Sequence, residues 1–204
     1  MSYTKIKLEY NYGPKNRFYR IVLIKDNPDL FKLGVALGTV LGATFSHCFL
    51  FRVKNNISYV MASFMETQYG QYRYLGNYNL SDLPDKFIFE YDTGDGWEFD
   101  CRKYKEKVEV ESTKDIILIE GKGQGIWEDN IYTLNALFAG EIDPDSTYED
   151  EENGICKPWN FDIDKYGDFD KPLNIEAENK LLDDNFQRNY KELNEMEKAY
   201  IKNI

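Results

Sequence analysis

An uncharged apolar segment at residues 33–51 constrains the fold of this 204-residue chain more than any other feature. The segment contains no Asp, Glu, Lys or Arg, and glycine recurs at every fourth position, at Gly34, Gly38 and Gly42. A helix that is apolar on all sides must be kept from water, either in a bilayer or at the centre of a folded domain. Glycine at this spacing lets a neighbouring strand or helix approach the backbone closely.

The surroundings of this segment favour the centre of a domain over a membrane. Ser46 and His47 interrupt the apolar run, no aromatic belt flanks it, and 30% of the whole chain is charged. Before it, Asp26-Asn-Pro-Asp29 supplies residues that cap and begin a helix. We therefore expect a buried helix over residues 29–42 and no membrane span.

Short alternating segments on both sides of this helix are typical of strands. In residues 3–10, apolar and charged residues alternate, which indicates a strand with one buried face. Thr93-Gly-Asp-Gly96 separates two further segments of this kind and predicts a hairpin turn. The segments expected to be strands are residues 3–10, 18–24, 47–54, 57–65, 86–92, 97–104, 108–110 and 116–119.

Two later segments, residues 129–138 and residues 173–203, are expected to be helical, whereas residues 69–78 are expected to be irregular. The apolar stripe of the last helix is expected to contain Leu182, Phe186, Tyr190 or Asn189, Leu193, Met196 and Tyr200. Because strands come first and helices last, the predicted fold class is α+β. It has a mostly antiparallel sheet wrapped around one apolar helix, with C-terminal helices.

The chain is expected to form a single domain over residues 1–204. Residues 3–140 would hold the sheet and the central helix, and residues 159–204 would form a C-terminal helical region. Residues 141–158 are expected to be an acidic loop, since no basic residue lies among the acidic residues of 141–152.

The overall charge disfavours a protein that binds nucleic acid directly. The chain has 25 basic and 36 acidic residues and a formal net charge of −11, whereas phosphate-binding surfaces are basic. Cys48, Cys101 and Cys156 lack a CxxC spacing, which argues against a disulfide framework and a structural zinc site. Because the N-terminus has no apolar signal core, we expect a reduced, cytoplasmic protein, and we predict no cofactor.

The single histidine, His47, excludes a multi-histidine metal site, and no metal site is predicted. The favoured interpretation of its ring is a buried side chain that is hydrogen-bonded to the backbone. The other interpretation is a group that transfers protons. Cys48 is the next residue along an expected strand, so its side chain would point to the opposite face and the two would not form a catalytic dyad.

The predicted hairpin concentrates acidic residues around a tryptophan. In the favoured interpretation, Asp92 and Asp95 accept backbone hydrogen bonds, the two glycines of the turn take positive φ values, and Trp97 enters the core. In the alternative interpretation, these carboxylates, Glu98 and the indole bind a cation or a sugar-like ligand.

A second acidic segment surrounds a glycine-bearing loop at residues 121–125, whose spacing does not match a phosphate-binding loop. If this loop and the hairpin tip meet, their carboxylates form a candidate site, since paired carboxylates support acid–base or metal-assisted chemistry. The ligand-binding candidates are His47, Asp92, Asp95, Trp97, Glu98, Glu120, Glu128 and Asp129.

Three segments, taken in this order, resemble a known family. They are Ser46-His-Cys-Phe-Leu-Phe51, Phe89-Glu-Tyr-Asp-Thr-Gly-Asp-Gly-Trp-Glu98, and Ile119-Glu-Gly-Lys-Gly123 followed by Glu128-Asp129. Over residues 3–185 the chain resembles the plasmid pRiA ORF-three-like family, also known as the insertion-element passenger TnpR family. The resemblance implies an α+β fold in which an antiparallel sheet wraps one apolar helix, and it implies no particular reaction. Ile126-Trp127 stands where the family's loop has Pro-Pro.

The second family name suggests a resolvase, which the sequence does not support. The chain has no catalytic serine with flanking arginines, no helix-turn-helix pattern and no basic stripe.

Two functions are compatible with these features. The favoured one is a non-enzymatic accessory protein of a mobile element that binds another protein, in view of the acidic surface, the aromatic content and the amphipathic last helix. The alternative is a small-ligand-binding protein or hydrolase-like enzyme that uses the carboxylates of residues 92–98 and 120–129. The alternative requires these side chains to meet in one site with His47 or Trp97 in its wall.

Overall fold

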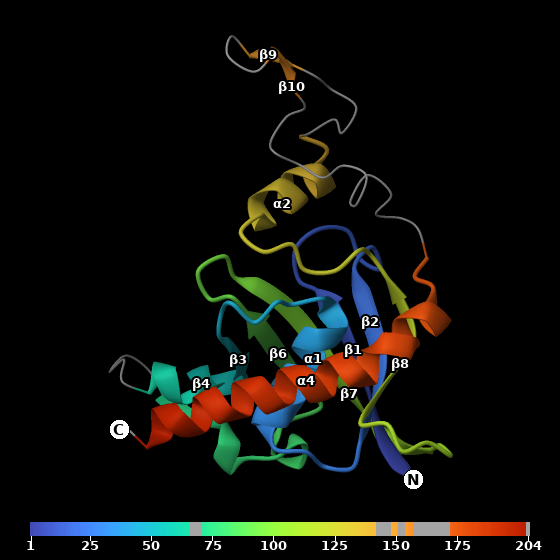
Figure 1. Cartoon of the computed structure of the whole chain (residues 1–204), viewed down its shortest axis with the longest axis vertical. Helices are drawn as coiled ribbons and strands as arrows, with labels where there is room; N and C mark the ends of the chain where they lie inside the picture. The colour runs from blue at the N-terminus through green and yellow to red at the C-terminus, as the bar shows by residue number, and fades with distance from the viewer. Residues whose placement is uncertain (66–70, 142–147, 151–153, 157–171, 203–204) are drawn as a thin grey trace.

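The computed structural model describes residues 1–65, 71–141, 148–150, 154–156 and 172–202. Its main element is an eight-stranded sheet of order β5-β4-β3-β6-β7-β1-β2-β8 (Figure 1). All neighbouring strands in it are antiparallel except β4 and β5, which are parallel. The strands are β1 (Ser2–Tyr10), β2 (Tyr19–Lys25), β3 (Phe49–Arg52), β4 (Ile57–Val60), β5 (Gln71–Tyr74), β6 (Lys86–Tyr91), β7 (Trp97–Glu109) and β8 (Ile116–Lys122). The predicted α+β class and mostly antiparallel sheet are confirmed.

The predicted apolar helix is α1 (Leu30–Leu41), which lies between the sheet and the last helix (Figure 1). Asp29 caps it by accepting a hydrogen bond of 2.7 Å from the Lys32 backbone N–H. Ten of its twelve residues are buried. At Gly34 an added Cβ would lie 2.0 Å from the ring of Phe49, so the glycine allows β3 to pack directly on the helix backbone.

No helix in the described ranges is both long enough and apolar enough to cross a membrane. The burial of α1 inside the domain accounts for the uncharged segment that raised this possibility.

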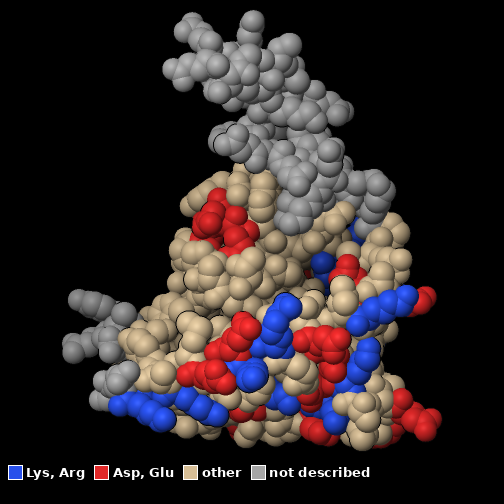
Figure 2. All heavy atoms as spheres, in the orientation of Figure 1, with Lys and Arg blue, Asp and Glu red and all other residues tan. Residues whose placement is uncertain are grey.

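The last helix, α4 (Ile175–Ile201), covers α1 and the edge strand β8. The side-chain amide of Asn179 accepts a hydrogen bond from the Leu118 N–H and donates one to its carbonyl oxygen, as a neighbouring strand would. Leu182 and Phe186 are buried as predicted, while the outward face carries interspersed basic and acidic side chains (Figure 2).

The apolar stripe of α4 was predicted wrongly near its C-terminal end. Met196 is 68% exposed, whereas Glu197 is only 5% exposed. The Glu197 carboxylate accepts a hydrogen bond of 2.7 Å from the Ala62 backbone N–H. A packed polar contact, rather than an apolar one, thus decides which of two adjacent positions faces the domain.

Several predicted strand boundaries also change. Residues 108–110 are not a separate strand, because β7 continues to Glu109 and Val108 pairs with Tyr3 of β1. Part of the segment expected to be irregular forms β5, paired with β4. The strand expected over residues 57–65 ends at Val60, and a 3₁₀ turn follows at Ala62–Phe64.

The region between the sheet and the last helix contains the predicted short helix and one additional pair of strands. The helix is α2 (Ile131–Ala139), expected over residues 129–138. Within the segment predicted as an acidic loop, β9 (Tyr148–Asp150) and β10 (Gly154–Cys156) pair antiparallel. The first part of the expected C-terminal helical region, residues 159–171, lies outside the described residues.

Candidate functional site

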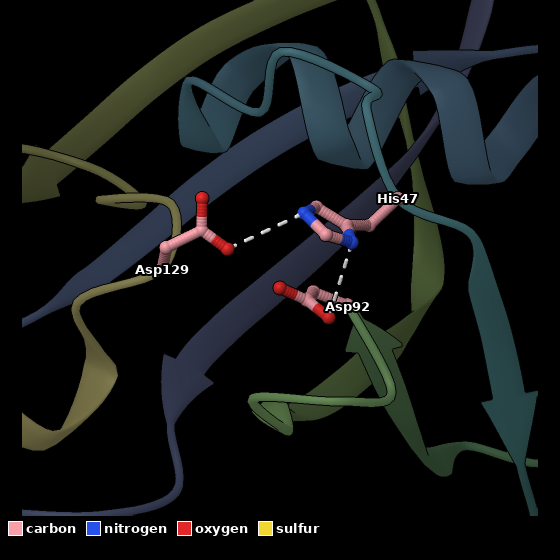
Figure 3. Close-up of side chains that lie close together, drawn as sticks. All are labelled: His47, Asp92 and Asp129. Carbon is pink, nitrogen blue, oxygen red and sulfur yellow. Dashed lines mark ion pairs between the residues drawn. The ribbon is translucent and has the colours of Figure 1, made fainter.

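The site forms around His47, which lies in the loop between α1 and β3. The Asp92 N–H donates a hydrogen bond of 2.9 Å to the Cys48 carbonyl oxygen, which extends the pairing of β3 with β6 beyond the ends of both strands. This contact places the Asp92 carboxylate beside the imidazole, with Oδ1 3.4 Å from Nδ1 of His47 (Figure 3).

A second segment reaches the same imidazole through a close backbone approach. Gly125 has φ +113°, and an added Cβ would lie 2.7 Å from the Leu41 carbonyl oxygen. The next residue, Ile126, donates a backbone hydrogen bond of 2.7 Å to that oxygen. The chain then turns so that Glu128 Oε2 and Asp129 Oδ1 lie 3.7 and 3.6 Å from Nε2 of His47.

Glu128 is anchored on both carboxylate oxygens. Oε1 accepts hydrogen bonds of 2.6 Å from the Thr44 N–H, the Thr44 hydroxyl and the Tyr91 hydroxyl, and Oε2 accepts one of 2.8 Å from the Ser46 hydroxyl. Burial alone would raise the pKa of Glu128, but these hydrogen bonds outweigh it and hold the pKa below its ordinary value. Glu128 therefore stays ionised and fixes the two loops to each other.

At the hairpin tip, Asp92 both stabilises the turn and lies beside His47. Asp92 Oδ1 accepts hydrogen bonds from the backbone N–H groups of Gly94 (3.0 Å) and Asp95 (3.3 Å), as predicted for a turn. The positive φ values occur at Asp92 (52°) and Gly96 (78°), so the expectation for Gly94 was wrong. The turn needs only one glycine because an aspartate tolerates this conformation when its own side chain bonds the backbone.

Asp95 is close enough to Asp92, Asp129 and His47 to be affected by their charges. Burial raises its pKa, and the negative charges of Asp92 and Asp129 raise it further. A hydrogen bond from the backbone of Ile131, the first residue of α2, works in the opposite direction. The side chain thereby links the hairpin to the start of α2.

The predicted interpretation of His47 as a buried, backbone-bonded ring was wrong. Its side chain is 35% exposed, and its two ring nitrogens face carboxylates from two different segments (Figure 3). One ligand atom from each of His47, Asp92 and Asp129 can be chosen so that all three lie within 4.8 Å of one another. The side chain of Asp92 is 5% exposed and that of Asp129 is 77% exposed, so the cluster is closed on one side and open to solvent on the other.

Imidazole nitrogen and carboxylate oxygen together form a donor set that suits divalent first-row transition metals. A ring nitrogen that binds a metal must carry a lone pair, and the other nitrogen then carries the proton. If Nδ1 of His47, beside Asp92, bound the metal, the Nε2–H would face Glu128, and a carboxylate in that position orients the ring of a metal-binding histidine.

Three of the predicted candidates lie outside this cluster. Glu98 instead pairs with Arg52 and accepts a hydrogen bond of 3.0 Å from the Asn11 amide. Glu120 accepts one of 2.6 Å from the Tyr19 hydroxyl, between β8 and β2. Trp97 is fully buried in the core, as the turn interpretation predicted.

The sequence analysis did not single out Thr44, Ser46 and Tyr91, which hold Glu128 in place. Two of them were within reach of sequence reasoning, since Ser46 directly precedes His47 and Tyr91 directly precedes Asp92 in the segments that carry the family resemblance.

A family model described as plasmid pRiA4b ORF-3-like protein matches residues 3–171, which include every residue of the cluster. The chain belongs to this family. Its fold is similar to that of a solved structure, the protein of unknown function MM3350 from Methanosarcina mazei Go1, with a TM-score of 0.58 and 18% sequence identity. The similarity covers 68% of this chain and 81% of that chain, and it concerns the fold alone. A search of curated proteins finds no match.

Proposed function

We propose that the protein binds a divalent transition-metal ion through His47, Asp92 and Asp129 and acts as a ligand-binding or hydrolase-like protein centred on that ion. The observation that carries this proposal is the distance of at most 4.8 Å between one donor atom of each residue. It replaces the expectation that a chain with one histidine has no metal site, because two carboxylates complete the donor set.

The charge balance of the cluster supports a cation. Four carboxylates, those of Asp92, Asp95, Glu128 and Asp129, surround one imidazole. Within the described residues, no Lys or Arg forms an ion pair with any of them. Like charges at this spacing repel each other, and a divalent cation would remove that repulsion.

The open side of the cluster supports a role in chemistry beyond structure. A structural metal site is usually closed by protein ligands, whereas a catalytic one keeps positions for water or substrate. The side chain of Asp129 is 77% exposed, so a ligand can reach this side of the cluster from solvent. A metal held there can polarise an oxygen of a bound ligand or lower the pKa of a bound water.

A non-enzymatic accessory protein that binds another protein, the function favoured by the sequence, is our second proposal, and fewer observations support it. It relied in part on the amphipathic last helix, and α4 uses Leu182 and Phe186 to cover its own domain. The acidic net charge still favours a protein over a nucleic acid as its partner. Free thiols at Cys48 and Cys101 are compatible with the cytoplasmic location that belongs to this proposal.

Calorimetric titration of the metal-free protein with Mn²⁺ and Zn²⁺ tests the metal site. We expect saturable binding of one ion, weakened by about 100-fold or more in His47→Gln and Asp129→Asn, because the first removes the imidazole donor and the second replaces a charged carboxylate donor with a neutral amide. Glu120→Gln is the matched control, since it removes a carboxylate outside the cluster and should bind like the unchanged protein. Absence of saturable binding, or equal weakening in the control, would refute the metal site.

A further inference from the structure

We propose that a lysine-lined pocket, at the end of the sheet opposite the His47 cluster, binds a small phosphate-type dianion. The pocket has a volume of about 450 Å³, and Thr4, near the start of β1, lies in its wall. The N-terminus, from which β1 starts, lies at the bottom of Figure 1, whereas α2 lies near the top. The residues that line it with polar atoms include Thr4, Asn27, Ser81, Lys103, Lys105 and Lys107.

The second half of β7 supplies the three lysines of the pocket. Along its first half, Trp97, Phe99 and Cys101 are buried in the core. Alternate residues of a strand share a face, so Lys103 continues the core-facing row beyond Cys101. The pairing of β7 with β1 then shifts register between Lys103 and Lys107, and Lys105 and Lys107 line the same pocket as Lys103. An apolar residue at position 103 would extend the core, whereas the chain has a lysine there and a pocket in front of it.

The pocket wall holds three lysines and one carboxylate, that of Asp85. Lys103 donates hydrogen bonds to the carbonyl oxygens of Leu80 and Leu83, and Lys107 donates one to the Thr4 hydroxyl. Lys105 pairs with the Asp85 carboxylate of the pocket wall at 3.4 Å, whereas Lys103 and Lys107 form no ion pair with the part of the chain that the structure describes. Two ammonium groups therefore rest on neutral oxygens, in a chain whose net charge is −11.

Lys103 shows that this arrangement has an energetic cost. Burial lowers its pKa, which means that its charged form is poorly solvated. A bound dianion would replace the missing solvation with charge-assisted hydrogen bonds.

The rest of the wall supplies fixed neutral donors. The Ser81 N–H donates to Asn27 Oδ1 (2.7 Å), and the Asn27 amide donates to the Ser81 hydroxyl oxygen (3.0 Å). The Ser81 hydroxyl proton remains available to a ligand, because its oxygen is the acceptor in that pair. Ammonium groups and a hydroxyl on one wall match a tetrahedral oxyanion.

The volume favours a phosphorylated small molecule, since small-molecule sites in proteins occupy about 300–1,000 Å³. Inorganic phosphate offers the same recognised group. The proposal is independent of the metal site, with which the pocket shares no residue.

Calorimetric titration with inorganic phosphate and with glycerol phosphate, each at an ionic strength held constant with sodium chloride, tests the pocket. We expect saturable binding of one anion, weakened about tenfold or more in Lys107→Gln. Tighter binding of glycerol phosphate would assign the site to phosphorylated small molecules, and equal binding would assign it to phosphate itself.

Lys54→Gln is the matched control, because Lys54 is an exposed lysine outside this pocket and the change in net charge is the same. Lys103→Gln is a second test, and its circular dichroism spectrum shows whether the loss of two carbonyl contacts has unfolded it. Absence of saturable binding, or equal weakening in Lys54→Gln, would overturn the proposal.

Discussion

The Tyr91 hydroxyl donates a hydrogen bond of 2.6 Å to Glu128, and this contact joins the end of β6 to the loop that precedes α2. The hydrogen bond shifts the pKa of both partners. Burial raises the pKa of Tyr91, and the hydrogen bond to the Glu128 carboxylate raises it further. The phenol thus remains a proton donor, and the carboxylate is held in its ionised form beside His47.

Tyr91→Phe should lower the free energy of unfolding by about 1–2 kcal/mol at neutral pH, since it removes one of several hydrogen bonds to a charged, half-buried acceptor. The Glu128 pKa should rise toward its ordinary value for the same reason. Urea denaturation measures the first effect. Tyr12→Phe is the control, because Tyr12 is largely exposed, and an equal loss in both variants would contradict this role.

Gly125→Ala should destabilise the protein by about 1–3 kcal/mol and weaken metal binding. An alanine there would be strained by φ +113°, and its Cβ would meet the Leu41 carbonyl oxygen, so the loop that carries Asp129 would have to shift. Thermal denaturation and the metal titration measure the two effects. Gly140→Ala provides a comparison, since φ is +72° there but no atom lies within 4 Å of the added Cβ. It should cost about 1 kcal/mol and leave metal binding unchanged.

Glu197→Gln should stabilise the protein at neutral pH and reduce the pH dependence of its stability. Burial raises the pKa of Glu197 above its ordinary value of 4.5, and the Ala62 N–H only partly opposes this. The folded state therefore holds this proton more tightly than the unfolded chain. The resulting stabilisation is complete below the unfolded pKa and is lost as pH rises through the folded pKa.

Urea denaturation at pH 5 and pH 7 tests the effect of Glu197→Gln. The amide oxygen can still accept the Ala62 hydrogen bond, so the variant isolates the charge. Glu195→Gln, at an exposed position of the same helix, should follow the original protein at both pH values. If the two variants behaved alike, the burial of Glu197 would not be the cause.

Arg20→Lys should lower the free energy of unfolding by about 3 kcal/mol or more. The buried guanidinium of Arg20 donates to carbonyl oxygens at the end of α1 (Val40, 3.3 Å), in β2 (Tyr19, 2.9 Å), and after β8 (Gly123, 2.9 Å). A lysine has only three donors on one nitrogen and cannot reach all of them. Arg102→Lys, at an exposed position of β7, is the control and should change stability by less than about 1 kcal/mol. A similar loss of stability in both variants would contradict the role of the Arg20 hydrogen bonds in joining these three segments.

The sequence by itself determined the local elements of this protein. The uncharged run, the Asp29 cap and the glycines predicted α1, because an apolar helix has one stable environment in a protein of this polarity. The Asp92 turn and the core position of Trp97 were likewise readable, since turn chemistry acts over a few residues.

Only the tertiary structure decided which carboxylates share a site. Glu120 and Glu128 lie in one short segment, yet one bonds Tyr19 and the other bonds Tyr91. They separate because the backbone leaves the sheet after Lys122, where β8 ends, and docks on the end of α1 at Gly125 and Ile126. Contacts of this kind join residues that are distant in the chain, so periodicity and spacing carry no information about them. The same holds for Glu197, whose burial depends on a backbone N–H supplied by another part of the chain.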